Sequence, residues 1–281
     1  MTRVLRLSDR WESVARGNRR ALLLAEADLR REFGGAAARA LDEVLIAAAG
    51  GALDRAQGRR VALAGVRGAA QGLQARIASA TLTGRRAART AAQGRLAREL
   101  REVARELRLA PLTPPPPADA AQDEALALAA GAAFAAPWSA GLTAAVLRWS
   151  RVGGELVPAL RAAAAAHQHR LDRLAATEVP KAYSEEHSEG AGWVAQLHRD
   201  ATWLPLVARR WDAANDRKTC AVCREMDGAL APLGGTFRGG LLPGEPHPHC
   251  RCQDTLIVLP VHLRERVPGR QVDDERPREA A

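Results

Sequence analysis

Six residues that could bind a soft metal ion fall within 33 positions near the end of the chain: Cys220, Cys223, His247, His249, Cys250 and Cys252. All four cysteines of the protein belong to this group. A Cys-x-x-Cys pair places two thiolates on one tight turn, and residues 250 and 252 point to the same side of an extended segment. Two such half-sites complete the tetrahedron that zinc prefers, so the sequence predicts a zinc site.

The predicted site offers more donors than the four that zinc needs. The preferred ligands are three cysteines with one of two candidates in the fourth position: Cys220, Cys223 and Cys250, with His247 or Cys252. Pro246 and Pro248 stiffen the approach of His247. A redox or disulfide role and four unrelated thiols are the alternatives. Clustering argues against unrelated thiols, and a reducing cytoplasm disfavours disulfides.

The composition of the cluster favours a structural ion over a catalytic one. A catalytic zinc keeps an open coordination position, whereas a thiolate-rich cage is typically closed, so we expect no enzymatic activity. Zinc deaminases have proline before their Cys-x-x-C, and Thr219 stands there. A zinc-containing, metal-dependent nuclease is the alternative, although His247 between two prolines fits the ββα unit of such enzymes poorly.

The remaining chain predicts an α+β protein of 281 residues, with a mostly helical N-terminal part and a small α+β C-terminal domain holding a zinc-knuckle-like cysteine cluster. We expect four segments: an Arg-rich helical region at 1–110, a Pro-rich linker at 111–120, a helical hairpin leading into the cysteine domain at 121–262, and a polar flexible tail at 263–281. From Trp203 onward, short apolar runs separated by glycines indicate a small sheet with loops.

Several breaks are predicted within the helical part. Gly34-Gly35 punctuates the first helical stretch, and the glycines between Arg55 and Arg98 favour short helices, since each costs about 1 kcal/mol relative to alanine. Residues 96–108 have the spacing of an amphipathic helix. A long helix begins at Glu155, and Glu178 on it has a capping or core hydrogen-bonding role. The histidines at 167, 169, 187 and 198 have polar helical surroundings and predict no special role.

Positive charge is concentrated in the N-terminal part. Residues 1–110 carry a net charge of +11 and residues 111–281 carry −2. From Arg55 to Arg98 there are ten arginines and no Asp or Glu, which predicts an electropositive surface. Three interpretations stay open: a solvated face, phosphate contacts with DNA, or docking to an acidic protein. Because no aromatic residue interleaves the arginines, base stacking is disfavoured.

The stretch Ala125–Leu147 is 23 residues long and uncharged, which is the length of a membrane span. It consists mostly of alanine and glycine, which contribute little transfer energy, and Pro137 stands in its centre. We therefore expect a buried helix at 120–136, a break, and a second helix at 139–152, without a membrane. The first residues lack the apolar core of a signal peptide, so we expect residence in the cytoplasm.

A composite motif connects the cysteines to a known family. It reads Trp211-x4-Asp216-Arg217-Lys218-Thr219-Cys220-x-x-Cys223-x3-Asp227-Gly228, followed by Pro246-His247-Pro248-x-Cys250-Arg251-Cys252. The combination resembles the phage Mu F-like minor head protein family. Ala176-Thr177-Glu178-x3-Ala182-Tyr183-Ser184 is similar to a helix that the family has upstream. The resemblance covers about residues 170–260.

The resemblance implies a minor capsid or head morphogenesis protein of a phage or prophage-derived element. Such a protein resides inside the virion head near the portal, after a period in the host cytoplasm during assembly. Its implied partners are the portal protein and other head proteins, and its role is to assist head assembly and DNA packaging or ejection. The Arg-rich stretch fits contact with DNA or with an acidic portal surface.

Overall fold

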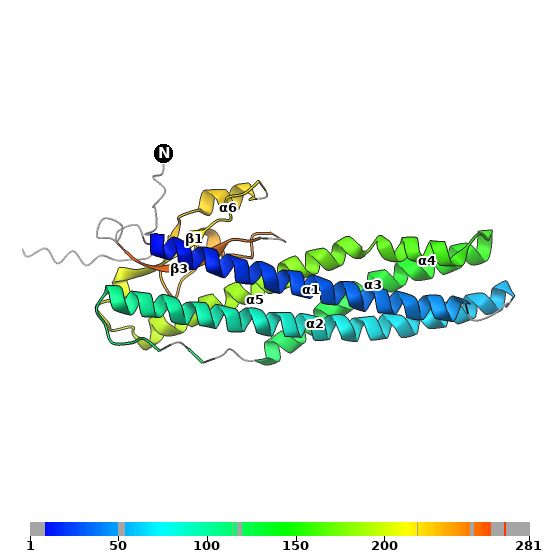
Figure 1. Cartoon of the computed structure of the whole chain (residues 1–281), viewed down its shortest axis with the longest axis horizontal. Coiled ribbons are helices and arrows are strands. Elements are labelled where there is room, and N and C mark those ends of the chain that lie inside the picture. The colour runs from blue at the N-terminus through cyan, green and yellow to red at the C-terminus, as the bar shows by residue number, and fades with distance from the viewer. Residues whose placement is uncertain are drawn as a thin grey trace, which may run out of the picture. The chain divides into compact units, whose positions relative to one another are not determined.

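The structure, a computed structural model, describes residues 9–49, 54–113, 115–116, 120–217, 219–247, 250–259 and 267. Long helices come first and a small sheet follows (Figure 1). The helices are α1 (Asp9–Ala49), α2 (Arg55–Glu106), α3 (Ala120–Val152), α4 (Leu156–Ala165), α5 (Gln168–Leu197) and α6 (Ala221–Met226). The strands are β1 (Val207–Asp212), β2 (Leu230–Ala231) and β3 (Gln253–Val258), and two 3-10 turns are Leu204–Leu206 and Arg238–Gly240.

The sheet is antiparallel with strand order β2-β1-β3. Strand β1 is central, and its ladder with β3 runs from the pair Val207 and Val258 to the pair Asp212 and Gln253. This small sheet after a helical part confirms the predicted α+β class.

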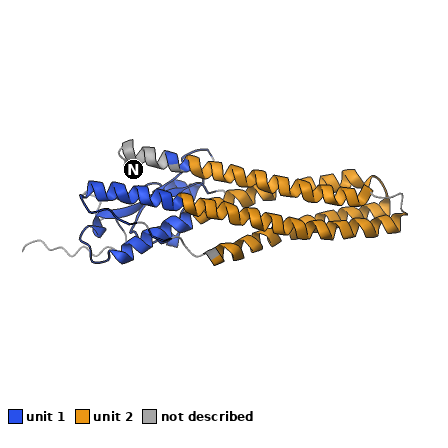
Figure 2. Cartoon of the chain, turned by 60° about the horizontal axis from the view of Figure 1, so that its bottom comes forward, with its two compact units in different colours: residues 1–19, 92–116, 184–281 blue, residues 20–91, 117–183 orange. Residues whose placement is uncertain are grey.

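The chain forms two compact units, coloured separately in Figure 2. Unit 1 comprises residues 1–19, 92–116 and 184–281, and unit 2 comprises residues 20–91 and 117–183. One boundary falls inside the predicted linker 111–120, and the other three fall within α1, α2 and α5. The predicted tail 263–281 lies outside the described residues except for Val267.

Unit 1 has an apolar core between its helices and the sheet. The buried members are Leu96, Leu100, Val103, Ala191, Val194, Val207, Leu233 and Leu256. Three of them come from the amphipathic segment predicted at 96–108, which is the last part of α2. That segment therefore packs its apolar face against α5 and the sheet, as its periodicity predicts.

The glycine breaks predicted in the helical part are wrong. Helix α1 continues through Gly34-Gly35, and α2 is one helix of 52 residues. At two of these glycines, α1 and α2 lie so close together that a side chain would not fit. A methyl group at Gly65 would lie 2.8 Å from the Cβ atom of Ala47, and one at Gly84 would lie 3.0 Å from the side chain of Leu29. The packing gained in this way offsets part of the cost of glycine within a helix. Small residues thus let α1 and α2 pack closely, and this contact between distant residues outweighs local propensity.

The break predicted at Pro137 is also wrong, because α3 runs without interruption across it. By length and composition alone, residues 121–152 could cross a membrane. In unit 2 the helix buries side chains at three- and four-residue spacing: Ala127, Ala130, Phe134, Trp138, Leu142 and Val146. This spacing is that of a helix with one face in a protein core. The long helix predicted from Glu155 is instead divided into α4 and α5.

Three of the ten arginines between Arg55 and Arg98 are buried, which corrects the prediction of an electropositive surface along the whole stretch. In unit 2, Arg85 Nε and Arg89 Nε each lie 2.8 Å from one oxygen of Asp123. Arg85 also donates to Glu178 Oε2 at 2.9 Å, which confirms a core hydrogen-bonding role for that carboxylate. These acids lie on α3 and α5, so the sequence of α2 alone does not predict the pairing.

Two glycine substitutions test the packing of unit 2. A methyl group at Gly131 of α3 would lie 2.5 Å from the backbone oxygen of Gln74, so Gly131→Ala should lower the free energy of unfolding by about 1–3 kcal/mol. Gly34 of α1 has open space around it, so Gly34→Ala should raise that free energy by about 0.5–1 kcal/mol. Urea denaturation of both variants measures the contrast, and a destabilised Gly34→Ala protein would contradict this account of α1.

Candidate metal centre

The two cysteine half-sites leave the sheet at the same end of the β1-β3 ladder. Strand β1 ends at Asp212, which pairs with Gln253, the first residue of β3. The first half-site follows β1 through a loop to α6, whose N-cap is Cys220 and which carries Cys223. The second half-site, Cys250 and Cys252, immediately precedes β3. The strand pairing therefore brings together residues that lie about 30 positions apart in sequence.

Five of the six sequence-predicted donors form one cluster. The ligand atoms of Cys220, Cys223 and His247 lie within 4.8 Å of one another, and so do those of Cys223, Cys250 and Cys252. Cys223 Sγ is shared, at 3.5 Å from His247 Nε2 and 3.6 Å from Cys250 Sγ. His249 lies outside the described residues.

These distances suit a tetrahedral ion. With Zn–S bonds of about 2.3 Å, two thiolates on one tetrahedral zinc stand ~3.8 Å apart. The Cys223 to Cys250 separation of 3.6 Å is close to that value. The cluster is therefore compatible with a bound metal, and five donors compete for four positions.

The non-cysteine motif residues hold the half-sites in place. Arg251, between the two cysteines of the second half-site, binds Asp216 through its two terminal guanidinium nitrogens, Nη1 and Nη2, at 2.5 and 2.7 Å. Asp216 precedes the first half-site, and its backbone N–H donates to the hydroxyl of Thr219 at 2.9 Å. The Asp216–Arg251 fork thus ties one half-site to the other, with the rigidity of a bidentate pair.

Asp227-Gly228 closes the turn after α6. Asp227 Oδ1 accepts from the backbone N–H of Ala213 at 3.0 Å, and its other oxygen accepts from Asn215. Gly228 has φ +77°, a left-handed conformation that favours glycine, and donates its N–H to the carbonyl of Trp211. This turn fixes α6 against the end of β1.

An apolar wall surrounds the sulfur atoms. The buried residues that pack with the cysteines are Trp211, Ala213, Met226, Ala231 and Phe237. Trp211 and Phe237 meet edge to face, with ring centroids 5.1 Å apart. Cys223, Cys250 and Cys252 are buried, while Cys220 and His247 are half-buried. A thiolate-rich site of this kind is protected from water and suits a structural ion.

Burial and contacts among the thiols shift their pKa values in opposite directions: the pKa values of Cys220 and Cys250 are lowered, and those of Cys223 and Cys252 are raised. The hydrogen bond from Cys252 lowers the pKa of Cys250 to about 5, although burial opposes it. The pKa of Cys252 is raised because its proton is held by Cys250 and because it is buried. Burial and the adjacent Cys250 thiolate raise the pKa of Cys223 to about 12. Metal binding must displace these held protons, so metal affinity should increase with pH.

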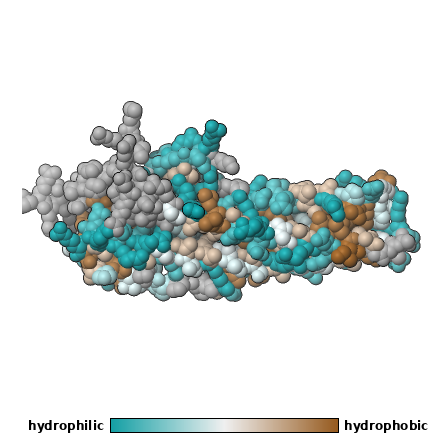
Figure 3. All heavy atoms as spheres, in the orientation of Figure 1, coloured by the Kyte–Doolittle hydropathy of each residue, from teal (hydrophilic) through white to brown (hydrophobic). Residues whose placement is uncertain are grey.

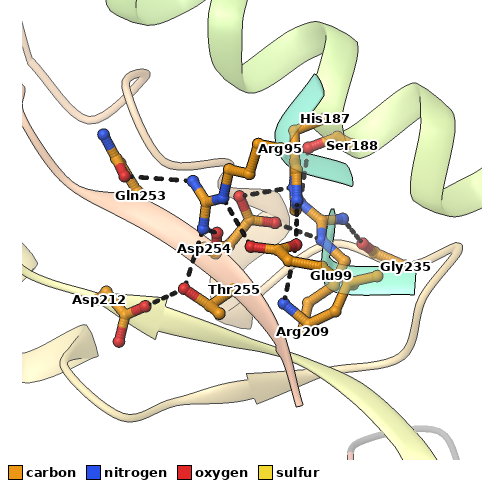
Figure 4. Close-up of polar contacts among 11 residues, drawn as sticks. Arg95, Glu99, His187, Ser188, Arg209, Asp212, Gly235, Gln253, Asp254 and Thr255 are labelled. Carbon is orange, nitrogen blue, oxygen red and sulfur yellow. Dashed lines mark hydrogen bonds and ion pairs between the residues drawn. The ribbon is translucent and has the colours of Figure 1, made fainter. Parts of the chain in front are cut away.

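A second cluster, of buried ions, lies in unit 1 beside the strands that carry the half-sites (Figure 4). Arg95 Nε of α2 lies 2.6 Å from Glu99 Oε1, and His187 Nε2 of α5 lies 2.7 Å from Glu99 Oε2. His187 Nδ1 lies 3.2 Å from Asp254 Oδ1, whose other oxygen pairs with Arg209 Nε at 2.5 Å. All five side chains are at most 2% exposed.

The buried ion cluster holds the strand ends from which the half-sites depart. Arg95 donates to Gln253 Oε1 at 3.1 Å, to Thr255 Oγ1 at 2.9 Å and to the backbone oxygen of Asp254. Thr255 in turn donates to Asp212, the last residue of β1. One arginine of α2 therefore positions the start of β3, immediately after Cys252.

Protonation in this cluster follows its charges. Burial alone would lower the pKa of His187, but the carboxylates of Asp254 and Glu99 outweigh it and raise that pKa. Burial opposes ionisation of Glu99, yet Arg95 and His187 hold its pKa below the usual range. The contacts therefore favour the protonated form of His187, whose two ring nitrogens face carboxylates. Its neighbours in the sequence predict no special role, because its partners come from α2 and β3.

His187-Ser188-Glu189 also has the H-x-E spacing that zinc deaminases place ahead of their cysteines. In that motif the histidine binds zinc. Here both ring nitrogens of His187 face carboxylates instead. The deaminase arrangement is therefore excluded by geometry as well as by Thr219.

No family model, curated protein or solved structure matches the chain in comparisons with known proteins.

The raised pKa of His187 predicts a pH dependence of stability. Because the imidazolium is stabilised in the fold, its contribution is fully present below its unfolded pKa of about 6.5 and is lost as pH rises through the folded pKa. The difference in free energy of unfolding between the wild type and His187→Gln should therefore shrink as pH rises above neutral. Urea denaturation over a pH series measures it, and a difference that grows with pH would contradict a buried imidazolium.

Proposed function

We propose that this protein is a minor head protein of a phage or prophage-derived element, and that a structural zinc ion stabilises its C-terminal region. It resides inside the head near the portal and assists head assembly and DNA packaging or ejection. One observation carries the proposal: the cysteines, His247, Asp216, Thr219, Arg251 and Asp227-Gly228 of the composite motif come together at one site.

Five motif residues other than the candidate ligands also belong to this site. Asp216 and Arg251 connect the half-sites, Thr219 hydrogen-bonds with Asp216, and Asp227-Gly228 closes the turn after α6. A motif that resembles the Mu F-like family thus corresponds to one cooperating structure. This convergence supports the family resemblance, since unrelated matches would have no reason to gather at one place.

Zinc is the metal that the donor set fits best. Thiolates and imidazole are the ligands of structural zinc, and the ligand atoms of both three-residue groups lie within 4.8 Å of one another. When bound, zinc would supply cross-linking between the loop after β1 and the segment before β3. The chain's own contribution is to bury three of the thiols behind Trp211 and Phe237. We assign no catalytic role to this centre.

Metal analysis tests the zinc centre. Purified protein should contain about one equivalent of zinc, and Cys220→Ser and Cys250→Ser should each lose it because a four-ligand site tolerates no missing thiolate. His198→Gln, which changes a histidine outside the cluster, should keep the metal. Comparison of His247→Gln with Cys252→Ser then identifies the fourth ligand. A metal-free wild type with four titratable thiols would refute the zinc centre.

Particle composition tests the head assignment. Heads purified after induction of the element that encodes the chain should contain it at low copy number, measured by quantitative mass spectrometry against the major capsid protein. Its absence from the heads would refute this assignment.

A cleavage assay tests the alternative nuclease function. Incubation of the protein with DNA and Mg²⁺, Mn²⁺ or Zn²⁺ should give no cleavage. Cleavage abolished by His247→Gln would favour the nuclease instead.

A further inference from the structure

Six arginines of unit 2 remain exposed at two neighbouring helix ends. Arg55, Arg59, Arg60 and Arg67 lie in the first turns of α2, and Arg148 and Arg151 lie at the end of α3. In the described part of the chain none of the six forms an ion pair, whereas Arg76 and Arg86 pair with Glu43 and Glu124. We call these six side chains the arginine end.

The start of α2 and the end of α3 lie against each other. A methyl group at Gly58 would lie 3.2 Å from the Trp149 ring, and one at Gly153 would lie 2.9 Å from Nη2 of Arg55. Both helix ends belong to unit 2. Residues far apart in sequence therefore contribute to a single positive surface.

The balance of charge at the arginine end is strongly positive. Residues 54–67 and 148–155 contain six basic and two acidic side chains, a net charge of +4. One of the two acids, Asp54, accepts a hydrogen bond from the backbone N–H of Gln57. On the adjacent α1, exposed Arg39 and Asp42 offset each other in charge. The other four arginines that α2 contributes to unit 2, Arg76, Arg85, Arg86 and Arg89, all have carboxylate partners, so within this unit the unpaired positive charge of α2 lies at the arginine end.

The other side chains at the arginine end favour contact with the phosphates of a nucleic acid over stacking on the bases of a single strand. Trp149, the aromatic residue here, is half-buried under Gly58 and offers no free ring for stacking. Exposed aliphatic side chains occur, namely Ile46, Val61 and Val152, and a hydrophobic patch is visible near one end of the helices in Figure 3. The choice of occupant rests on the arginines, because none of the six forms an ion pair in the described part of the chain and all six are exposed.

We propose that the arginine end is a docking surface for duplex DNA, which it binds through phosphates without reading sequence. The inference rests on the proposed function for its setting, since a head protein meets packaged DNA. Arginine pairs with phosphate through two parallel hydrogen bonds, and each neutralised phosphate releases counterions. Affinity should consequently be insensitive to sequence and strongly dependent on salt.

Fluorescence anisotropy of the full chain with two unrelated DNA duplexes over a salt series tests this docking surface. Both duplexes should bind equally, and log affinity should fall with log salt by about 0.9 per phosphate contacted. The triple variant Arg55→Gln/Arg59→Gln/Arg60→Gln should bind at least about tenfold more weakly, with a slope shallower by about 2–3. The matched triple Arg101→Gln/Arg170→Gln/Arg173→Gln removes the same charge from exposed positions elsewhere and should leave affinity nearly unchanged.

Three results would overturn the docking surface. The first is no measurable binding by the wild type, and the second is an equal loss in both triple variants, which would indicate diffuse attraction by net charge. The third is tighter binding to phosphatidylserine vesicles or to polyglutamate than to DNA, which would indicate a membrane or an acidic protein. Both triple variants should keep the wild-type thermal midpoint, because all six substituted side chains are exposed. Zinc content and particle composition are measured independently, so failure here is distinguishable from failure of the proposed function.

Discussion

Unit 1 depends on a buried histidine held between two carboxylates. His187 of α5 faces Glu99 of α2 and Asp254 of β3, and Arg95 and Arg209 complete the cluster. Each of these ions is costly to bury alone, so the cluster is stable only when all partners are present. This requirement gives a geometric specificity that apolar packing between alanine-rich helices does not supply, because it fixes which residues of α2 and α5 face the sheet.

The metal centre extends the same constraint. The buried ion cluster holds Asp254 and Thr255 at the start of β3 and, through Thr255, Asp212 at the end of β1. Both cysteine half-sites continue from these strand ends over loops that contain few large apolar residues. Ordering such loops costs conformational entropy, and a metal ion shared by the two half-sites would offset part of that cost. The helices thus fix the strand ends from which the two cysteine segments continue. Coordination of a metal ion would fix the conformation of those segments.

The arginines divide into two groups with opposite physical roles. Arg85, Arg89 and Arg95 are buried and donate hydrogen bonds within their units. Arg85 and Arg89 pair with Asp123 of α3, whereas Arg95 pairs with Glu99 of α2 and donates to residues of β3. The arginine end keeps its charge in solvent. A stretch of α2 without a single acidic residue therefore contributes both to the buried ion pairs and to an exposed positive surface, depending on whether each side chain faces a core or solvent.

The sequence by itself determined the α+β class, the amphipathic segment at 96–108 and the membership of the cysteine cluster, because residue type and spacing encode these directly. Only the tertiary structure decided the rest. Helices α1, α2 and α3 continue through glycines and through Pro137, since packing between distant residues outweighs a local cost of about 1 kcal/mol per glycine. The role of His187 could likewise not be predicted from the sequence, because it depends on carboxylates of α2 and β3 that only the fold brings to this side chain.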